Sequence, residues 1–185
     1  LGIDLAGIAD NGGSWPHNGG HHMGRKWPIL FAGIMLDNKH MMEVGKWKTM
    51  FQEDAQTFYV RKKDVDISHS KGWRPDKRAK KLPYEAKHIG LPDWGIRHKL
   101  KPTTDNLHWK ATYRAINGPT YPAIILAAHI MGQKEAWNHD ALFDYTDRWL
   151  SNGPFSRKPD SKHYGHYVYG GKFVQKMWAT YRAQY

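Results

Sequence analysis

Histidine, glycine and arginine are concentrated between Trp15 and Arg25, immediately before an apolar segment with helical spacing. His21 and His22 can exchange protons near neutral pH, and the Arg25 guanidinium can hold a carboxylate or sulfate with two hydrogen bonds. The glycines let backbone approach a ligand, and free N–H groups at a helix start favour anions. Two interpretations remain open. The cluster is a site for binding and proton transfer on an acidic sugar, with Trp15 and Asn18 as further contacts, or a connection whose histidines cap local backbone.

A second group of polar residues follows Trp137, near the start of a predicted helix. His139 is predicted to bind substrate. Asp140 and Asp144 are an acidic pair one helical turn apart, and Asp144 can form a salt bridge with Arg148. Carboxylates in this pattern are typical of a solvated helix face. Two opposed carboxylates about 5–10 Å apart can instead hydrolyse a glycosidic bond, and the sequence leaves both interpretations open.

Tyr113 and Arg114 stand side by side near the end of a predicted helix, and Tyr59 is a further candidate of the same kind. A tyrosine beside an arginine can serve β-elimination, with the phenol as proton donor or base. Tyr113 is therefore a candidate catalytic residue and Arg114 a candidate substrate-binding residue. Core packing of Tyr113 and an interaction of Arg114 with the helix dipole explain the same pair without a ligand.

No cofactor is predicted, and a metal site is an alternative with weak support. The chain has no cysteine, which excludes disulfides, thiolate catalysis and thiolate metal sites. The adjacent imidazoles of His21 and His22 point in different directions in most conformations. The pair His163 and His166 lacks the carboxylate spacing of zinc-binding helices. A nucleophile elbow, a P-loop and a dinucleotide fingerprint are also absent from the sequence.

The chain has a formal charge of +11, and most of the excess lies between Arg61 and Thr104, where thirteen Lys or Arg residues face five Asp or Glu. Such a field favours an anionic partner, which can be nucleic acid, an acidic membrane surface or an acidic polysaccharide. A loop this long inside a compact domain is usually functional or else disordered. Trp73 and Trp94 have loop-like flanks, so their rings are either available to a ligand or fasten the loop to the body.

The apolar spacing predicts a mainly α fold. Residues 1–24 are expected to form a folded loop, and helices are expected at about 27–36, 40–50, 105–116, 121–131, 134–150 and from 172. Helical hairpins with short turns assemble into bundles, solenoids or toroids. Six or seven helices are too few for a double-layered toroid of about twelve. We therefore expect residues 1–185 to be one helical domain, a fragment or processed part of a larger (α/α) toroid, with 61–104 as a basic insertion. The sequence contains no apolar run of ~18 residues, so no membrane span is predicted.

Three stretches resemble the C-terminal part of secreted bacterial proteins with an (α/α) toroid, an architecture shared by many polysaccharide lyases and glycoside hydrolases. The stretches are Gly24–Gly33, Trp137–Trp149 and Phe173–Trp178. The resemblance implies an extracellular or periplasmic location. It also implies a Tyr or His base and an Arg, Asn or Glu that neutralises a uronate carboxylate. His21, His22, Arg25 and Tyr113 are the residues that fit those parts. Helix-packing motifs support architecture more than activity.

Charge, aromatic rings and the His–Arg cluster together predict a carbohydrate-active protein for an anionic polysaccharide, first a lyase that works by β-elimination and next a glycoside hydrolase. The alternatives are a non-catalytic protein that binds a polyanion or glycan, and a nucleic-acid-binding protein. The second alternative is less favoured, because the sequence has no Arg-loaded recognition helix and no RNA-binding signature. The remainder of the toroid, or another chain, is a further expected partner.

Overall fold

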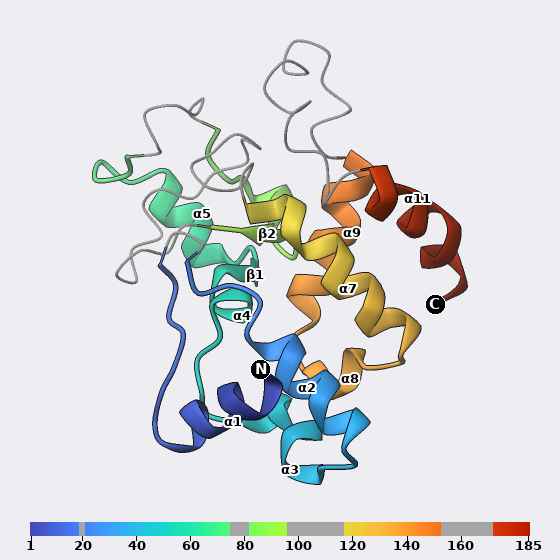
Figure 1. Ribbon diagram of the computed structural model, residues 1–185. Coiled ribbons are helices and arrows are strands. Elements are labelled where there is room, and N and C mark those ends of the chain that lie inside the picture. The colour runs from blue at the N-terminus through green and yellow to red at the C-terminus, as the bar shows by residue number, and fades with distance from the viewer. Residues whose placement is uncertain (19–20, 75–81, 96–116, 153–171) are drawn as a thin grey trace.

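The computed structural model describes residues 1–18, 21–74, 82–95, 117–152 and 172–185, and within these ranges the chain is mainly helical, as predicted (Figure 1). The α-helices are α1 (Gly2–Asp10), α2 (Lys26–Met35), α3 (Lys39–Met42), α4 (Gln52–Gln56), α5 (Lys62–Ser68), α7 (Tyr121–Ile130), α8 (Lys134–Trp137), α9 (Asp140–Asn152) and α11 (Lys172–Tyr181). Short 3-10 helices are η1 (Val44–Lys46), η2 (Ala86–His88), η5 (Gly118–Thr120) and η8 (Arg182–Gln184). No helix in these ranges is both long and apolar enough to cross a membrane.

Helices α1, α2 and α3 pack together at one end of the molecule, while α7 contacts both α9 and α11 on the opposite side (Figure 1). One main core joins the two groups. Its largest fully buried members include Ile29, Leu30, Trp94, Ile125, Trp137, Leu142, Phe143, Tyr145 and Trp149. A smaller cluster of Phe58, Val60 and Tyr84 lies beside it. The predicted helix at 105–116 lies outside the described residues, and the toroid stays a prediction.

Helices α2 and α7 lie where the apolar spacing predicts them. Each has a proline in its first turn, Pro28 in α2 and Pro122 in α7, where the missing N–H removes no helical hydrogen bond. Gly132 follows α7 with a φ of 65°, the left-handed conformation that closes a helix without a Cβ clash. Local sequence signals are sufficient for these two elements.

The expectation of a folded loop over residues 1–24 is wrong for its first part, because α1 forms there. Leu5, Ala6 and Ala9 give α1 a buried side that packs on α2. A Cβ atom on Gly2 would lie 2.2 Å from the Pro28 carbonyl oxygen, so the glycine allows the two helices to touch. Gly2 thus serves the contact between the two helices at this end.

The predicted helix at about 40–50 is also wrong, since α3 ends at Met42 and η1 follows it. A Cβ atom on Gly45 would lie 2.2 Å from the Ala136 carbonyl oxygen and 2.8 Å from the Cβ of Asn138. The chain therefore turns at Gly45 to press its backbone against residues 136–138. This contact between distant segments replaces the continuous helix.

The single helix predicted at 134–150 is in fact two helices, α8 and α9, separated by Asn138 and His139. Asn138 adopts the left-handed conformation, with φ 58° and ψ 45°, which asparagine tolerates better than most residues. Its Nδ2 donates a hydrogen bond of 2.9 Å to the Gly45 carbonyl, which stabilises the break. As a result, His139 lies in a turn between two helices.

Two strands, which the sequence does not predict, pair antiparallel: β1 (Thr57–Tyr59) and β2 (Pro92–Trp94), with Thr57 opposite Trp94. Strand β2 belongs to the basic segment 61–104, whose described part also contains α5 and η2. The fully buried Asp93 accepts a hydrogen bond from the Tyr84 hydroxyl (2.7 Å), and Arg148 Nη1 lies 3.5 Å from its Oδ1. The described part of this segment is therefore folded onto the body rather than irregular.

Candidate functional site

The loop from Trp15 to Arg25 is held by helix α4, whose Gln52 side chain is completely buried. Gln52 Oε1 accepts hydrogen bonds from the backbone N–H groups of Asn18 (3.3 Å) and His22 (2.9 Å), and its Nε2 donates to Gln56 Oε1 (2.7 Å). Buried polar groups are normally paired in this way. The polar character of the loop is thus used for its own attachment.

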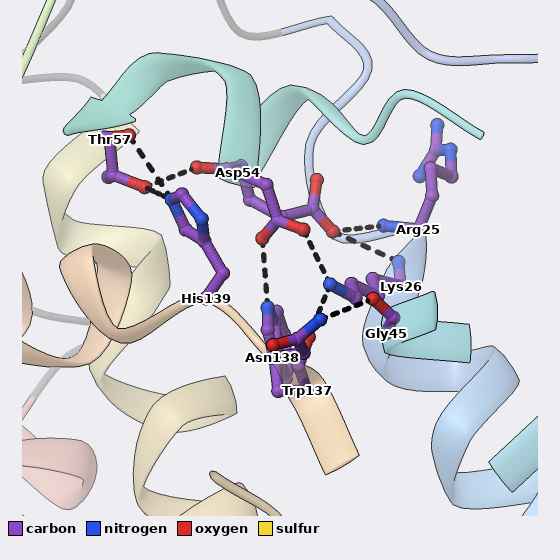
Figure 2. A network of polar contacts seen from close by, with 9 residues as sticks. Arg25, Lys26, Gly45, Asp54, Thr57, Trp137, Asn138 and His139 are labelled. Atoms are coloured by element: carbon purple, nitrogen blue, oxygen red, sulfur yellow. Dashed lines mark hydrogen bonds and ion pairs between the residues drawn. The ribbon is translucent and has the colours of Figure 1, made fainter. Parts of the chain in front are cut away.

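The N-terminus of α2 is capped by Glu53, also from α4. Glu53 Oε1 accepts hydrogen bonds from the backbone N–H groups of Arg25 (3.1 Å) and Lys26 (2.9 Å; Figure 2). The anion site expected at this helix start is therefore filled by the protein itself. Burial, and next the neighbouring Asp54, raise the pKa of Glu53 to about 7.

Neither predicted catalytic histidine of the loop lines the surface hollow described below. His22 Nδ1 donates to the Pro16 carbonyl (2.9 Å), as the second interpretation of this cluster expects, while His21 is exposed. Arg25 Nη1 donates to the Met23 carbonyl (3.2 Å). Arg25 is likewise absent from the lining of that hollow.

Of the two interpretations of the candidate tryptophans, attachment of the segment to the body holds for Trp15 and Trp94, and their predicted role in substrate binding does not fit their burial. Trp15 is buried and stacks on Phe51 with ring centroids 5.5 Å apart. Trp94 is buried too, and its Nε1 donates to the Tyr121 hydroxyl (2.8 Å). Both rings fasten their segments to the core, while Trp73 is half-buried. The remaining candidates lie outside the described residues: Tyr113, Arg114, His163 and His166.

A surface hollow of about 790 Å³ lies between β1 and the α8–α9 segment, and we call it the His139 groove. Its volume is within the range of about 300–1,000 Å³ that is usual for ligand sites. Its lining consists of Ala55, Thr57, Phe58, Tyr59, Arg61, Lys134, Glu135, Asn138, His139, Asp140 and Ala141. Of the substrate-binding candidates that lie in the described ranges, only His139 is among them.

The contacts of His139 determine which of its ring nitrogens carries the proton. Nε2 lies 3.1 Å from the Thr57 carbonyl oxygen, which can only accept, so Nε2 is the donor. Nε2 also lies 2.9 Å from Thr57 Oγ1, whose own proton is donated to the Glu53 carbonyl (2.8 Å; Figure 2). Nδ1 of the neutral imidazole therefore has a free electron pair, and no described residue forms a hydrogen bond to it. His139 is a candidate proton acceptor in the groove.

Tyr59 lies on the same face of β1 as Thr57, because alternate residues of a strand share a face about 7 Å apart. Its hydroxyl donates a hydrogen bond of 2.5 Å to Asp144 Oδ2, in the first turns of α9. Burial, and next this hydrogen bond, raise the pKa of Tyr59 well above its ordinary value. The phenol therefore keeps its proton, and Tyr59, which lines the same groove as His139, is a candidate proton donor.

Cations and carboxylates are balanced along the His139 groove. Lys134 Nζ lies 3.5 Å from Asp144 Oδ1 and 3.8 Å from Asp140 Oδ1, and Arg61 Nε lies 3.7 Å from Asp64 Oδ2. Each of the two cations thus has an acidic neighbour. The described lining of this groove therefore carries no excess of positive charge.

A buried ion pair holds the turn that presents His139. Lys26 is only 2% exposed, and its Nζ donates to Asp54 Oδ2 (2.5 Å) and to the Trp137 carbonyl (2.5 Å). Trp137 Nε1 donates to the other Asp54 oxygen (2.9 Å), so both ends of Trp137 are fixed (Figure 2). Asn138 follows directly and is fixed to Gly45. The backbone on the N-terminal side of His139 is therefore rigidly positioned by three distant segments.

Sequence reasoning named Asp144 as one of an acidic pair near His139, but it missed Thr57 and Lys134 as members of this site. The sequence contains no signal for either of these two residues. No group of three or more His, Asp or Glu side chains suited to a metal ion occurs within the described ranges. Comparison of the chain with models of known protein families, with curated proteins and with solved structures finds no match.

Proposed function

We propose that this protein is a carbohydrate-active enzyme of the polysaccharide lyase type, with the His139 groove as its site for a uronate-bearing glycan. The observation that carries the proposal is that a candidate proton acceptor and a candidate proton donor line the same groove. His139 has a free Nδ1, and Tyr59 has a phenol that keeps its proton. A β-elimination needs one acceptor and one donor of this kind.

In the proposed reaction, His139 Nδ1 removes the proton on C5, next to the uronate carboxylate. The electron pair of that C–H bond forms the C4–C5 double bond, and the bond from C4 to the glycosidic oxygen breaks. Tyr59 gives its proton to the departing oxygen and regains one through solvent as His139 loses its own. Lys134 and Arg61 are the described cations of the groove. Each would have to exchange its present acidic neighbour for the uronate carboxylate in order to offset its charge during proton removal.

The test is incubation of the chain with alginate, ulvan and glycosaminoglycans while the absorbance of an unsaturated product is followed. His139→Ala and Tyr59→Phe should each lower the rate by about 10²- to 10⁴-fold, the usual contribution of a positioned acid or base. Exposed residues of the same types give matched controls, His21→Ala and Tyr185→Phe. The absence of product with every acidic glycan would count against the proposal.

Glycoside hydrolysis is a second candidate, favoured by the two carboxylates that share Lys134. Asp140 and Asp144 each have an oxygen within 4 Å of the same Nζ atom, so they lie near enough to act as an acid and base pair. New reducing ends without an unsaturated product would favour this reaction. Non-catalytic glycan binding and nucleic-acid binding stay predictions. If the wild type shows no turnover and His139→Ala loses affinity for the glycan, a non-catalytic glycan-binding role would be favoured.

A further inference from the structure

His129 lies in the last turn of α7, and the proposed reaction does not use its imidazole. The side chain is only 7% exposed, and its ring packs edge-on against the Phe143 ring of α9, with the ring centroids 5.1 Å apart. Its Nε2 is buried, and no described residue forms a hydrogen bond to it. Because buried nitrogen atoms are normally paired, this one calls for an explanation beyond packing.

The charged groups around His129 already pair with one another. They are Arg182 of η8, Lys134 of α8, and Asp144 and Asp147 of α9. Arg182 Nε and Nη2 donate to the two carboxylate oxygens of Asp147, at 2.8 and 2.7 Å. Lys134 Nζ lies 3.5 Å from Asp144 Oδ1. A proton on His129 would therefore add a buried positive charge for which these described groups offer no free counter-ion.

The packing around His129 accepts the neutral imidazole and opposes the charged one. Burial, and next Arg182, lower the pKa of His129 below its ordinary value of 6.5. An imidazole released into solvent would titrate near that ordinary value. The packed state therefore binds fewer protons than the released state, and it loses stability as pH falls below about 6.5.

The C-terminal segment, which we define as α11 with η8, is the element beside His129 that is most readily detached. None of its side chains is fully buried, and both of its helices contact α7. Trp178 packs against the main core while remaining partly exposed, and Arg182 connects the segment to α9. Gln175 Nε2 is also buried without a partner among the described residues, which weakens the attachment. Local opening is expected where buried apolar contacts are fewest.

We infer that protonation of His129 detaches the C-terminal segment from α7 and α9, so that this segment is a pH-sensitive latch on the body. The imidazole takes up one proton from solvent. The new cation repels Arg182, the residue that fastens the segment to Asp147. When the segment moves away, this repulsion is relieved and water reaches the imidazolium. The inference does not depend on the proposed function of the His139 groove.

Because the chain contains no cysteine, one nitroxide spin label can be attached at a single introduced cysteine. Ala183→Cys, at an exposed position of η8, reports on the C-terminal segment. Lys39→Cys, at an exposed position of the distant helix α3, is the control (Figure 1). EPR spectra of each labelled full chain are recorded between about pH 8 and pH 5. The ratio of mobile to immobile η8 label should rise by up to about tenfold for each pH unit below 6.5, as uptake of one proton requires. The α3 label should not change.

A side chain that does not titrate tests the assignment to His129. His129→Gln should keep the η8 label immobile throughout the pH range, because no proton is taken up at this position. His21→Gln, which removes an exposed histidine, is the matched control and should retain the wild-type response. If His129→Gln prevents folding, His129→Phe retains a ring beside Phe143 and gives the same test. The inference would be overturned by a wild-type η8 label that does not respond to pH, by a response that persists without His129, or by release of both labels together.

Discussion

Two histidine-bearing regions of this protein have similar polar compositions and different surroundings. In the loop from Trp15 to Arg25, helix α4 supplies Gln52 and Glu53 to pair the backbone N–H groups. In the turn at His139, the supporting bonds come from Lys26 and Asp54 and leave the imidazole on a groove. Both His22 and His139 donate one N–H to a carbonyl, so that bond does not distinguish them. The decisive difference is the proton donor and the hollow beside His139.

A segment that is rich in polar residues can be structural for that very reason. A glycine-rich loop has many backbone groups to pair, and the nearest buried side chains pair them. A single histidine between two helices needs little pairing of its own. Its second nitrogen is therefore free for a ligand.

The first prediction compares the turnover of variants in the two histidine-bearing regions. His139→Ala should lower turnover of an acidic glycan by about 10²- to 10⁴-fold, because the proton acceptor is lost. His21→Ala combined with His22→Ala should change turnover by less than about threefold, since neither side chain faces the groove. Initial rates of unsaturated product formation check both. If the variant with His21→Ala and His22→Ala were as inactive as His139→Ala, the loop would be part of the catalytic site.

A second prediction concerns the pH dependence of stability. Glu53 caps α2 and lies on α4, the helix that also holds the loop from Trp15 to Arg25. The pKa of Glu53 is raised from 4.5 to about 7 by burial and by Asp54. The folded chain thus keeps a proton that the unfolded chain has lost. The free energy of unfolding should fall as pH rises from about 4.5 to above 7, by about 3 kcal/mol.

Glu53→Gln should remove that pH dependence, because the amide does not titrate. Urea unfolding at several pH values, with wild type and variant compared at each, measures the difference. The exposed Glu135→Gln is the control and should retain the slope of the wild type. Parallel pH curves for wild type and Glu53→Gln would contradict the assignment.

The structural role of the loop attachment gives a third prediction. Gln52→Ala leaves the N–H groups of Asn18 and His22 without their acceptor, which should cost about 2 kcal/mol of unfolding free energy. Turnover per folded molecule should be nearly unchanged. Gln184→Ala, at an exposed position, should cost less than about 0.5 kcal/mol. A Gln52 variant of full stability with low turnover would assign the loop a chemical role after all.

The smallest expected effect is at Thr57, a positioning residue for His139. Thr57→Val removes the hydroxyl contact to Nε2, but the Thr57 carbonyl remains 3.1 Å away and still fixes the tautomer. Turnover should fall by only about fivefold, the equivalent of one hydrogen bond. The exposed Thr180→Val, which loses a similar local bond, is the control. A loss as large as that of His139→Ala would indicate that the hydroxyl itself takes part in the reaction.

Much of the helical framework could be predicted, and little of the candidate site. The apolar spacing of α2 and α7 and the glycine after α7 are signals within one segment. The left-handed Asn138 gave no such signal, because its conformation depends on contact with Gly45. The strand pairing of Thr57 with Trp94 likewise joins segments with no common pattern.

By itself, the sequence determined the mainly helical class, the positions of α2, α7 and α11, and the absence of cysteine chemistry. These properties follow from composition and from periodicity over one or two helical turns. Only the tertiary structure decided which histidine faces a groove, since His139 is oriented by Thr57, 82 positions away. It also decided that Trp15 and Trp94 are core residues, because burial depends on what distant parts of the chain place around a ring.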